Sequence, residues 1–250
     1  MAFEDILYEK KENFAKITIN RPQVMNAFRT HTLKEMAEAL EQTDLDDEVR
    51  ALIITGAGER AFCAGGDFSE IKEGFGYAKE MDYWHTKVHM AIRNLSKPVI
   101  AAVNGYAIGG GNVLVTLCDL AIAADTAIFG QAGPRVGSFD AGFGAAYLAR
   151  IVGEKKAREI WFLCRQYTAQ EALAMGLINK VVPLTKLSEE AENWCREISK
   201  LSPTAIKFLK FAFNADSDQI YGLENLSMSA VRLFWQTEES ASMKKSRRKD

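Results

Sequence analysis

The stretches AFCAGGD, at Ala61–Asp67, and NGYAIGGGNVL, at Asn104–Leu114, decide the fold of this chain. Each is a turn of small residues that follows an apolar run typical of a buried strand, Ala51–Thr55 before the first and Pro98–Val103 before the second. Glycine has no Cβ, so a ligand can lie against the main chain at such a turn. Two turns of this kind, the second opening a helix, can aim two backbone N–H groups at one carbonyl oxygen, as in an oxyanion hole.

Composition narrows the class of protein. With 250 residues, 48% of them hydrophobic, the chain fits one large domain, or one domain with a small appendage. A net charge of −2 argues against a nucleic-acid surface, which needs an excess of Lys and Arg. The four cysteines form no CxxC pair, which favours reduced thiols over a disulfide frame or zinc ligands. With neither a secretory signal nor an apolar run of about 20 residues, we expect a soluble cytoplasmic protein without a membrane partner.

The order of the patterns indicates layered β-β-α units, because strands and glycine turns alternate with helices. Between Ser69 and Tyr83 the pattern weakens, which is typical of a loop that carries specificity residues. Amphipathic helices are predicted over Leu187–Leu201 and Pro203–Phe213, and a solvated charge run over Met243–Asp250.

Together the two glycine turns resemble those of the crotonase (enoyl-CoA hydratase/isomerase) superfamily, and the resemblance extends over residues 3–240. It implies an α/β fold, a ClpP-like ββα-superhelix spiral with a helical C-terminal region for trimerisation. We therefore expect a core with a CoA-thioester site at residues 1–190 and a helical oligomerisation region with a basic tail at 191–250. The implied partners are an acyl-CoA substrate and copies of the chain in a homotrimer or homohexamer. No tightly bound cofactor and no metal are implied.

The resemblance also assigns site residues. Gly66 and Gly110 would donate the oxyanion N–H groups. Arg29 would contact a CoA phosphate, although it is also interpretable as a plain surface arginine. The full set expected to contact substrate or CoA lies on the two turns, the segment before them, the following loop and the C-terminal part: Val24, Met25, Ala27, Arg29, Ala64, Gly65, Asp67, Phe68, Tyr77, Tyr106, Ser138 and Trp235.

Two positions depart from the hydratase pattern. Hydratases of this superfamily carry a glutamate two residues after the GGG turn and another two residues after FGQ. Here these positions are Val113 and Gly133, and neither side chain can transfer a proton. We therefore do not expect a simple enoyl-CoA hydratase.

The segment IFGQAGPRVGSFDAGFGAAYLARIVGEKKAREIWFLCRQY, residues 128–167, closely resembles 1,4-dihydroxy-2-naphthoyl-CoA synthases. These lyases of menaquinone biosynthesis close a ring by intramolecular Claisen condensation of o-succinylbenzoyl-CoA. The resemblance implies a bound bicarbonate at Gln131, Gly133 and Trp161; alternatively, Gln131 satisfies backbone groups and Trp161 belongs to the core. It makes Asp140 the catalytic acid, against the alternative that Asp140 caps the next helix.

Other residues differ from those of the synthases and leave a second function possible. The synthases have a basic loop after GGD, whereas residues 68–73 here are acidic, and Trp235 replaces a tyrosine. The usual C-terminal extension, with its CoA-contacting lysine, is replaced by a short basic tail. Asn112 is similar to the equivalent residue of 2-ketocyclohexanecarboxyl-CoA hydrolase, which opens a ring of a β-keto thioester. An RNA-binding or a degenerate CoA-binding homologue is a further hypothesis, although the first helix is acidic where RNA binding requires lysines.

Two histidines and several aromatic residues have no role in the site described so far. His85 and His89 have i,i+4 spacing on a helix expected over Tyr83–Leu95, a spacing that can hold a metal. The sequence gives no evident third ligand, so no metal site is predicted. Core or trimer contacts are expected for Phe208, Phe211, Phe213, Phe234 and Trp235.

Overall fold

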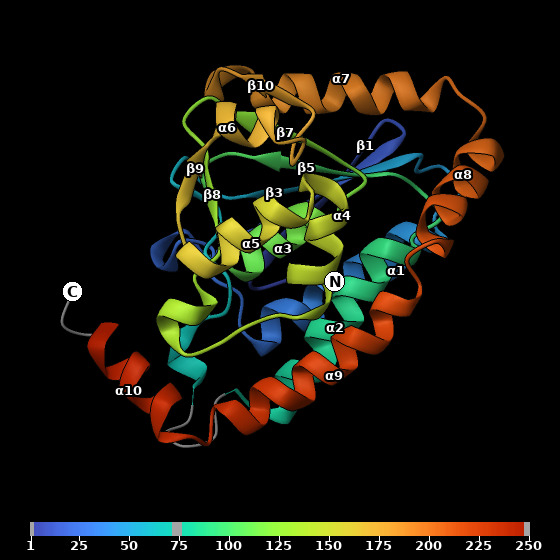
Figure 1. Cartoon of the computed structure of the whole chain (residues 1–250). Coiled ribbons are helices and arrows are strands. Elements are labelled where there is room, and N and C mark those ends of the chain that lie inside the picture. The colour runs from blue at the N-terminus through green and yellow to red at the C-terminus, as the bar shows by residue number, and fades with distance from the viewer. Residues whose placement is uncertain (1–2, 72–76, 248–250) are drawn as a thin grey trace.

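Two β-sheets form the centre of the molecule in the computed structural model, which describes residues 3–71 and 77–247 (Figure 1). The larger sheet has the order β1-β2-β3-β5-β7-β10, and its strands are Ile6–Lys11, Phe14–Ile19, Ala51–Gly56, Val99–Val103, Leu120–Ala124 and Lys180–Val182. The smaller sheet has the order β4-β6-β8-β9, with strands Ala61–Cys63, Tyr106–Ile108, Ile128–Gly130 and Gln166–Thr168. From β3 to β8 successive strands alternate between the two sheets, and this arrangement confirms the predicted ββα spiral.

The apolar runs of the sequence explain the centre of the larger sheet. All five residues of β5 are buried, as are all but one of β3, because parallel strands covered on both faces need apolar side chains throughout. By contrast, β1 pairs antiparallel with β2 at the edge and leaves most of its side chains partly or fully exposed. The two glycine turns begin at the ends of β4 and β6, so the sheets determine where the turns lie.

Ten α-helices and five shorter helical segments surround the sheets in the described part of the chain. The α-helices are α1 Thr30–Leu45, α2 Lys79–Asn94, α3 Gly110–Leu117, α4 Leu148–Val152, α5 Glu154–Leu163, α6 Ala169–Ala174, α7 Leu187–Ser199, α8 Pro203–Ala215, α9 Gln219–Phe234 and α10 Glu238–Arg247. The 3-10 turns are η1 Pro22–Val24, η2 Phe68–Glu70, η3 Gly133–Val136 and η5 Leu184–Lys186, and η4 Gly142–Tyr147 is a π-helix. No helix among the described residues is both long and apolar enough to cross a membrane.

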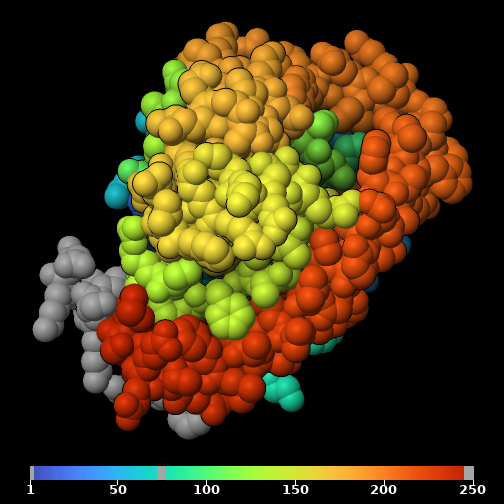
Figure 2. Space-filling view, viewed as in Figure 1, coloured from blue at the N-terminus to red at the C-terminus, as the bar shows by residue number. Residues whose placement is uncertain are grey.

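The last helices run round the edge of the molecule in this view: α7 lies at the top, α8 and α9 follow the right side to the bottom, and α10 lies at the lower left (Figures 1 and 2). Helix α7 packs on β3, β5 and β7, so the boundary expected at residue 190 falls inside a helix that covers the sheet. Lys210 anchors α8: it is buried, and its Nζ lies 2.7 Å from Asp119 Oδ2. Helix α9 continues past α2 to the π-helix η4, and α10 reaches η3. The C-terminal helices thereby form one wall of the site.

Two local expectations need correction. The segment over Met243–Asp250 is not simply a solvated charge run, because α10 extends to Arg247 and Lys244 turns toward the interior. The helix expected over Tyr83–Leu95 begins earlier, at Lys79. Of the loop expected between Ser69 and Tyr83, residues 72–76 lie outside the described residues, and so do the last three residues of the tail.

Candidate active site

The two glycine turns touch each other. Strands β4 and β6 are parallel neighbours, so the turns that follow them lie side by side. A Cβ built on Gly65, whose φ is +90°, would lie 3.0 Å from the Gly110 nitrogen, and one built on Gly110 would lie 3.4 Å from the Gly65 Cα. Only glycine permits this approach of two main chains. The sequence prediction that the turns converge is therefore borne out by the backbone.

The amides of Gly66 and Gly110 are available to a ligand. Within the described part of the chain, neither N–H donates a hydrogen bond, and both residues line the same cavity. Gly110 is the first residue of α3, where the N–H groups have no partner inside the helix and the helix dipole favours negative charge. Two such donors can stabilise an oxyanion.

The cavity has a volume of about 340 Å³ and runs from the glycine turns to the C-terminal helices. It contains both oxyanion candidates, Asp140 and the three residues expected at a bicarbonate. It also contains most of the residues expected to contact substrate or CoA: Met25, Ala64, Gly65, Phe68, Tyr77, Tyr106, Ser138 and Trp235. Residues far apart in the chain, from Met25 to Trp235, thus line one cavity.

Four expected residues do not line the cavity: Val24, Ala27, Arg29 and Asp67. Arg29 is held by the N-terminal segment, because its guanidinium lies 2.7 Å from both Glu4 and Asp5. The Asp67 carboxylate pairs with Arg21 at 2.8 Å and accepts the Ser69 N–H at 2.9 Å. Both charges are thus paired within the chain, and the expected contacts of Arg29 and Asp67 with CoA stay predictions.

The positions of the two missing glutamates are apolar or filled. Val113 lines the cavity with an aliphatic side chain that is 2% exposed. A Cβ on Gly133 would lie 2.7 Å from the Ser138 carbonyl oxygen and 2.8 Å from the Trp161 ring. A glutamate at residue 133 would therefore require the surrounding backbone to move. Among the described residues that line the cavity there is no glutamate.

The residues expected at a bicarbonate share one wall, but they are not equivalent. Gln131 is 3% exposed, and its amide oxygen and nitrogen both lack a hydrogen-bond partner among the described residues. A buried amide of this kind calls for a polar ligand. The indole N–H of Trp161 instead donates to the Gly144 carbonyl at 2.6 Å. Gln131 is thus the side chain able to hold an anion here, and Trp161 stabilises the π-helix.

Asp140 lines the cavity and does not cap the next helix, the alternative that the sequence left open. Its Oδ1 accepts the Gly142 N–H at 2.9 Å, but the N-cap position of η4 is Ala141, which makes no side-chain cap hydrogen bond. Its Oδ2 is buried without a hydrogen-bond partner among the described residues, and the residue lines the cavity. Burial, together with the neighbouring Glu224 carboxylate, raises the pKa of Asp140 to about 7. A carboxyl group with this pKa can act as an acid near neutral pH.

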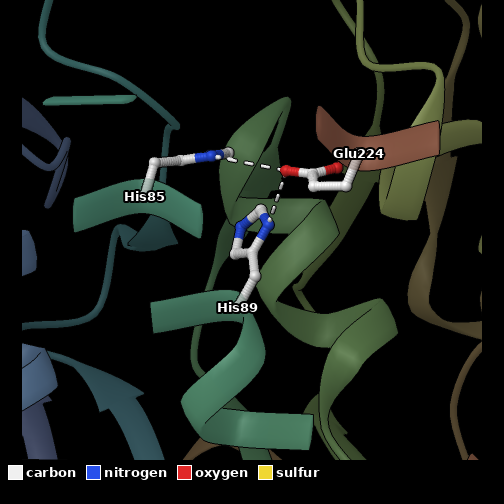
Figure 3. A group of neighbouring side chains, drawn as sticks. All are labelled: His85, His89 and Glu224. Atoms are coloured by element: carbon white, nitrogen blue, oxygen red, sulfur yellow. Dashed lines mark hydrogen bonds and ion pairs between the residues drawn. The ribbon is translucent and has the colours of Figure 1, made fainter. Parts of the chain in front are cut away.

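A cluster of His85, His89 and Glu224 lies beside Asp140 (Figure 3). Burial, and then the nearby His89, lowers the pKa of His85 to about 3. Burial acts to raise the pKa of Glu224, but the hydrogen bond with His89 and the proximity of His85 bring it down to about 2. The three side chains offer two imidazole nitrogens and a carboxylate oxygen, a donor set that suits a transition metal. The sequence showed the two histidines, but Glu224 is 135 residues beyond His89 and carried no signal.

The end of the cavity near the C-terminus holds Tyr77, Trp235 and Lys244. The Tyr77 and Trp235 rings meet edge to face with centroids 5.4 Å apart, and the Tyr77 hydroxyl lies against Gly66. Lys244 Nζ lies 5.5 Å from the centre of the Trp235 ring, and burial lowers the pKa of Lys244. Lys244 is the only Lys or Arg among the described lining residues. Sequence reasoning missed it because the tail was interpreted as solvated.

Comparisons with known proteins agree with this geometry. The sequence model of the enoyl-CoA hydratase/isomerase family matches residues 9–249. An enoyl-CoA hydratase from Mycobacterium avium subsp. paratuberculosis K-10 is 25% identical, with 98% of this chain and 99% of that chain covered and a TM-score of 0.89. An enoyl-CoA hydratase/isomerase from Xanthobacter autotrophicus Py2 is 28% identical, with coverages of 100% and 94% and a TM-score of 0.88. An enoyl-CoA hydratase from Bacillus anthracis is 31% identical, with coverages of 94% and 92% and a TM-score of 0.78.

Proposed function

The chain belongs to the enoyl-CoA hydratase/isomerase family of acyl-CoA enzymes, and from this premise we propose that it makes a C–C bond next to a thioester. In this proposal the Gly66 and Gly110 amides hold the thioester oxygen as the α-carbon becomes an enolate. Asp140 gives its proton to, or hydrogen-bonds, the carbonyl that the enolate attacks. The best-matched reaction is the ring closure of o-succinylbenzoyl-CoA by 1,4-dihydroxy-2-naphthoyl-CoA synthases.

One observation carries the proposal. Asp140, whose pKa is raised to about 7, lines the same cavity as Gly66 and Gly110, while the positions from which hydratases activate water hold Val113 and Gly133. Addition of water to a double bond needs a base next to that water. Condensation needs a stabilised enolate and an activated carbonyl, and this site offers groups for both. For this reason simple hydration is not proposed, although solved relatives bear the name enoyl-CoA hydratase.

Bicarbonate as the base is part of the proposal. The unpartnered Gln131 amide supports an anion beside Gly133. Because Trp161 already donates its N–H to Gly144, Gln131 would carry the recognition alone. Lys244 would then replace the missing basic loop as the partner of a substrate carboxylate.

Ring opening, as in 2-ketocyclohexanecarboxyl-CoA hydrolase, is the second candidate. Asn112 supports it through its similarity to the equivalent residue of that enzyme. The residue is fully buried on α3, and both polar atoms of its amide lack a partner among the described residues. The two reactions use the same enolate site in opposite directions, so Gly66, Gly110 and Asp140 would keep their roles.

The test is turnover of three CoA esters by the purified full-length chain, with and without bicarbonate. We expect o-succinylbenzoyl-CoA to give the naphthoyl product, recognised by its absorbance, and crotonyl-CoA to remain unhydrated. Ring opening of 2-ketocyclohexanecarboxyl-CoA without naphthoyl product would select the second candidate. Efficient hydration of crotonyl-CoA would overturn both.

A homotrimer, or a hexamer of two trimers, is proposed as the assembly. Apolar side chains stand exposed along α8 and α9, where a monomer would leave them in water: Phe208, Leu209, Phe211, Phe213, Leu223, Leu226 and Leu233. Large apolar side chains exposed in this number on neighbouring helices are typical of an interface.

A further inference from the structure

His85, His89 and Glu224 converge on a single point between α2 and α9 (Figure 3). The Nδ1 atoms of His85 and His89 lie 3.8 Å and 3.3 Å from the same oxygen, Glu224 Oε1. All three donor atoms lie within 4.8 Å of one another. The two histidines are one turn apart on α2, so the helix holds both rings on one face.

These distances fit a shared metal ion. Zinc is bound by histidine nitrogen and carboxylate oxygen at about 2 Å, and two ligands of a tetrahedral ion are then roughly 3.3 Å apart. The His89–Glu224 pair already has this separation. The His85–Glu224 pair needs to close by only a few tenths of an ångström, within the reach of side-chain rotation.

A hydrogen-bonded network explains the cluster less completely. One N–H of His89 can donate to Glu224 Oε1, but His85 Nδ1 at 3.8 Å is too far for a hydrogen bond. His85 Nδ1 is buried and has no hydrogen-bond partner among the described residues. A buried polar atom left in this way costs free energy, and a bound ion would satisfy it.

Charge points to a cation at the same place. Glu224 is 0% exposed, and within the described chain the basic groups at ion-pair distance from it are the two histidines, without Lys or Arg. A buried carboxylate is strongly unfavourable unless a positive charge compensates it. A divalent ion bound by two neutral imidazoles and one carboxylate supplies this charge.

The surroundings hold the carboxylate in a ligating orientation. The Phe143 N–H donates to Glu224 Oε2 at 3.3 Å, which leaves Oε1 for the imidazoles. Gly142 makes the approach possible, because any side chain there would clash with Glu224. The Phe28 ring lies 5.7 Å from the His85 ring and the Phe143 ring 5.8 Å from that of His89, centroid to centroid. Such outer contacts are what orient metal ligands.

We propose that His85, His89 and Glu224 form a binding site for a divalent transition-metal ion of the Zn²⁺ class. His85 lines the cavity, so the site would lie at the cavity wall. The site has the His₂-carboxylate composition found where zinc keeps a position open. The proposal depends on the geometry of the cluster and not on which acyl-CoA reaction the enzyme performs.

The test is direct metal binding to the tag-free full-length chain after removal of metal with a chelator. Calorimetric titration with Zn²⁺ should show one ion per chain, and Co²⁺ should give the visible absorption of a four-coordinate site. His85→Gln and Glu224→Gln should each weaken binding by ~100-fold or more, since each removes one of three protein ligands.

His31→Gln is the matched control, because His31 is a half-exposed histidine that pairs with Glu35 at 3.1 Å and does not line the cavity. It should bind Zn²⁺ like the unaltered chain. Circular dichroism checks that each variant is folded. If one of the two ligand variants does not fold, the other provides the test. The proposal would be overturned if the unaltered chain failed to bind one Zn²⁺, or if both ligand variants bound Zn²⁺ as tightly as the unaltered chain.

Discussion

Asp140 and Glu224 accept consecutive backbone N–H groups of the same turn. Asp140 Oδ1 takes the Gly142 N–H at 2.9 Å, and Glu224 Oε2 takes the Phe143 N–H at 3.3 Å. Two carboxyl groups held this close in a buried site do not ionise together easily. Glu224, with histidines beside it, keeps the charge, and Asp140 keeps the proton. The proton needed at the cavity is thus maintained by a residue that does not line it.

The raised pKa of Asp140 predicts how the stability of the metal-free protein depends on pH. The unfolded chain releases this proton near pH 3.8, whereas the folded chain holds it up to about 7. The folded state therefore binds more protons between these values, and the free energy of unfolding falls as the pH rises through this window. Asp140→Asn should remove this part of the pH dependence. Near pH 8 the free energy of unfolding of the variant should exceed that of the unaltered chain by roughly 2–4 kcal/mol. Urea unfolding at about pH 5 and 8 measures the free energy of unfolding of both chains. An identical change between the two pH values for both chains would contradict the raised pKa.

Asp140→Asn should also separate binding from chemistry. The amide keeps the shape of the side chain but cannot give up the proton, so turnover should fall by ~10²–10⁴-fold. The dissociation constant for a CoA ester should change little, because the glycine amides and the apolar wall are intact. Steady-state kinetics with the active substrate and calorimetric binding provide the two measurements. Retained turnover would exclude Asp140 from the mechanism.

Gly110→Ala should block the oxyanion site by a steric route. A Cβ on Gly110 would lie 2.7–2.8 Å from the edge of the Phe28 ring, so ring or backbone must move and the amide is displaced. Loss of one such donor costs ~10²–10³-fold in kcat. The double variant Phe28→Leu with Gly110→Ala removes the clash and should recover part of the activity. Equal activity of Gly110→Ala and the unaltered chain would show that this amide is not used.

Lys244→Met tests the lysine that the C-terminal helix brings to the cavity. Because Lys244 is the cation among the described lining residues, its loss should raise KM for a substrate with a free carboxylate by roughly tenfold. A neutral acyl chain should be affected much less, and kcat should change little in both cases. Lys186→Met is the control, since Lys186 is exposed and pairs with Glu189 at the surface. An equal rise in KM for both substrates would point to CoA binding instead.

The sequence was sufficient where the information is local. The continuous apolar runs at Ala51–Thr55 and Pro98–Val103 predicted buried parallel strands, and the glycines after Cys63 and Ile108 predicted turns that need close backbone approach. The apolar runs are continuous because parallel strands are covered on both faces. The glycines are needed because only glycine permits the close approach of the two turns. The fold and the meeting of the two turns follow from them.

Side-chain partners far apart in the chain could not be inferred in the same way. Glu224 lies on α9, within the region expected to be helical, and the sequence marks it only as a single charge among moderately apolar residues. Arg29 and Asp67 match the expected positions, yet their charges are taken by Asp5 and Arg21. The packing of separate elements decides which of several nearby charged residues form ion pairs. The sequence pattern holds no information on this packing.

The exposed apolar face of α8 and α9 gives the last prediction, on assembly. Phe208 is 64% exposed and Phe213 77% exposed, and burying two phenylalanines of this size in an interface stabilises it by several kcal/mol, about 1.5–3 for each. A chain with both changed to aspartate should lose the oligomer, since the charges would have to be buried unpaired. Light scattering coupled to size exclusion should give three or six copies for the unaltered chain and one for the double variant. Glu154→Asp at the exposed start of α5 is the control for a surface change away from α8 and α9. A monomer in both cases would show that this face is covered by something other than copies of the chain.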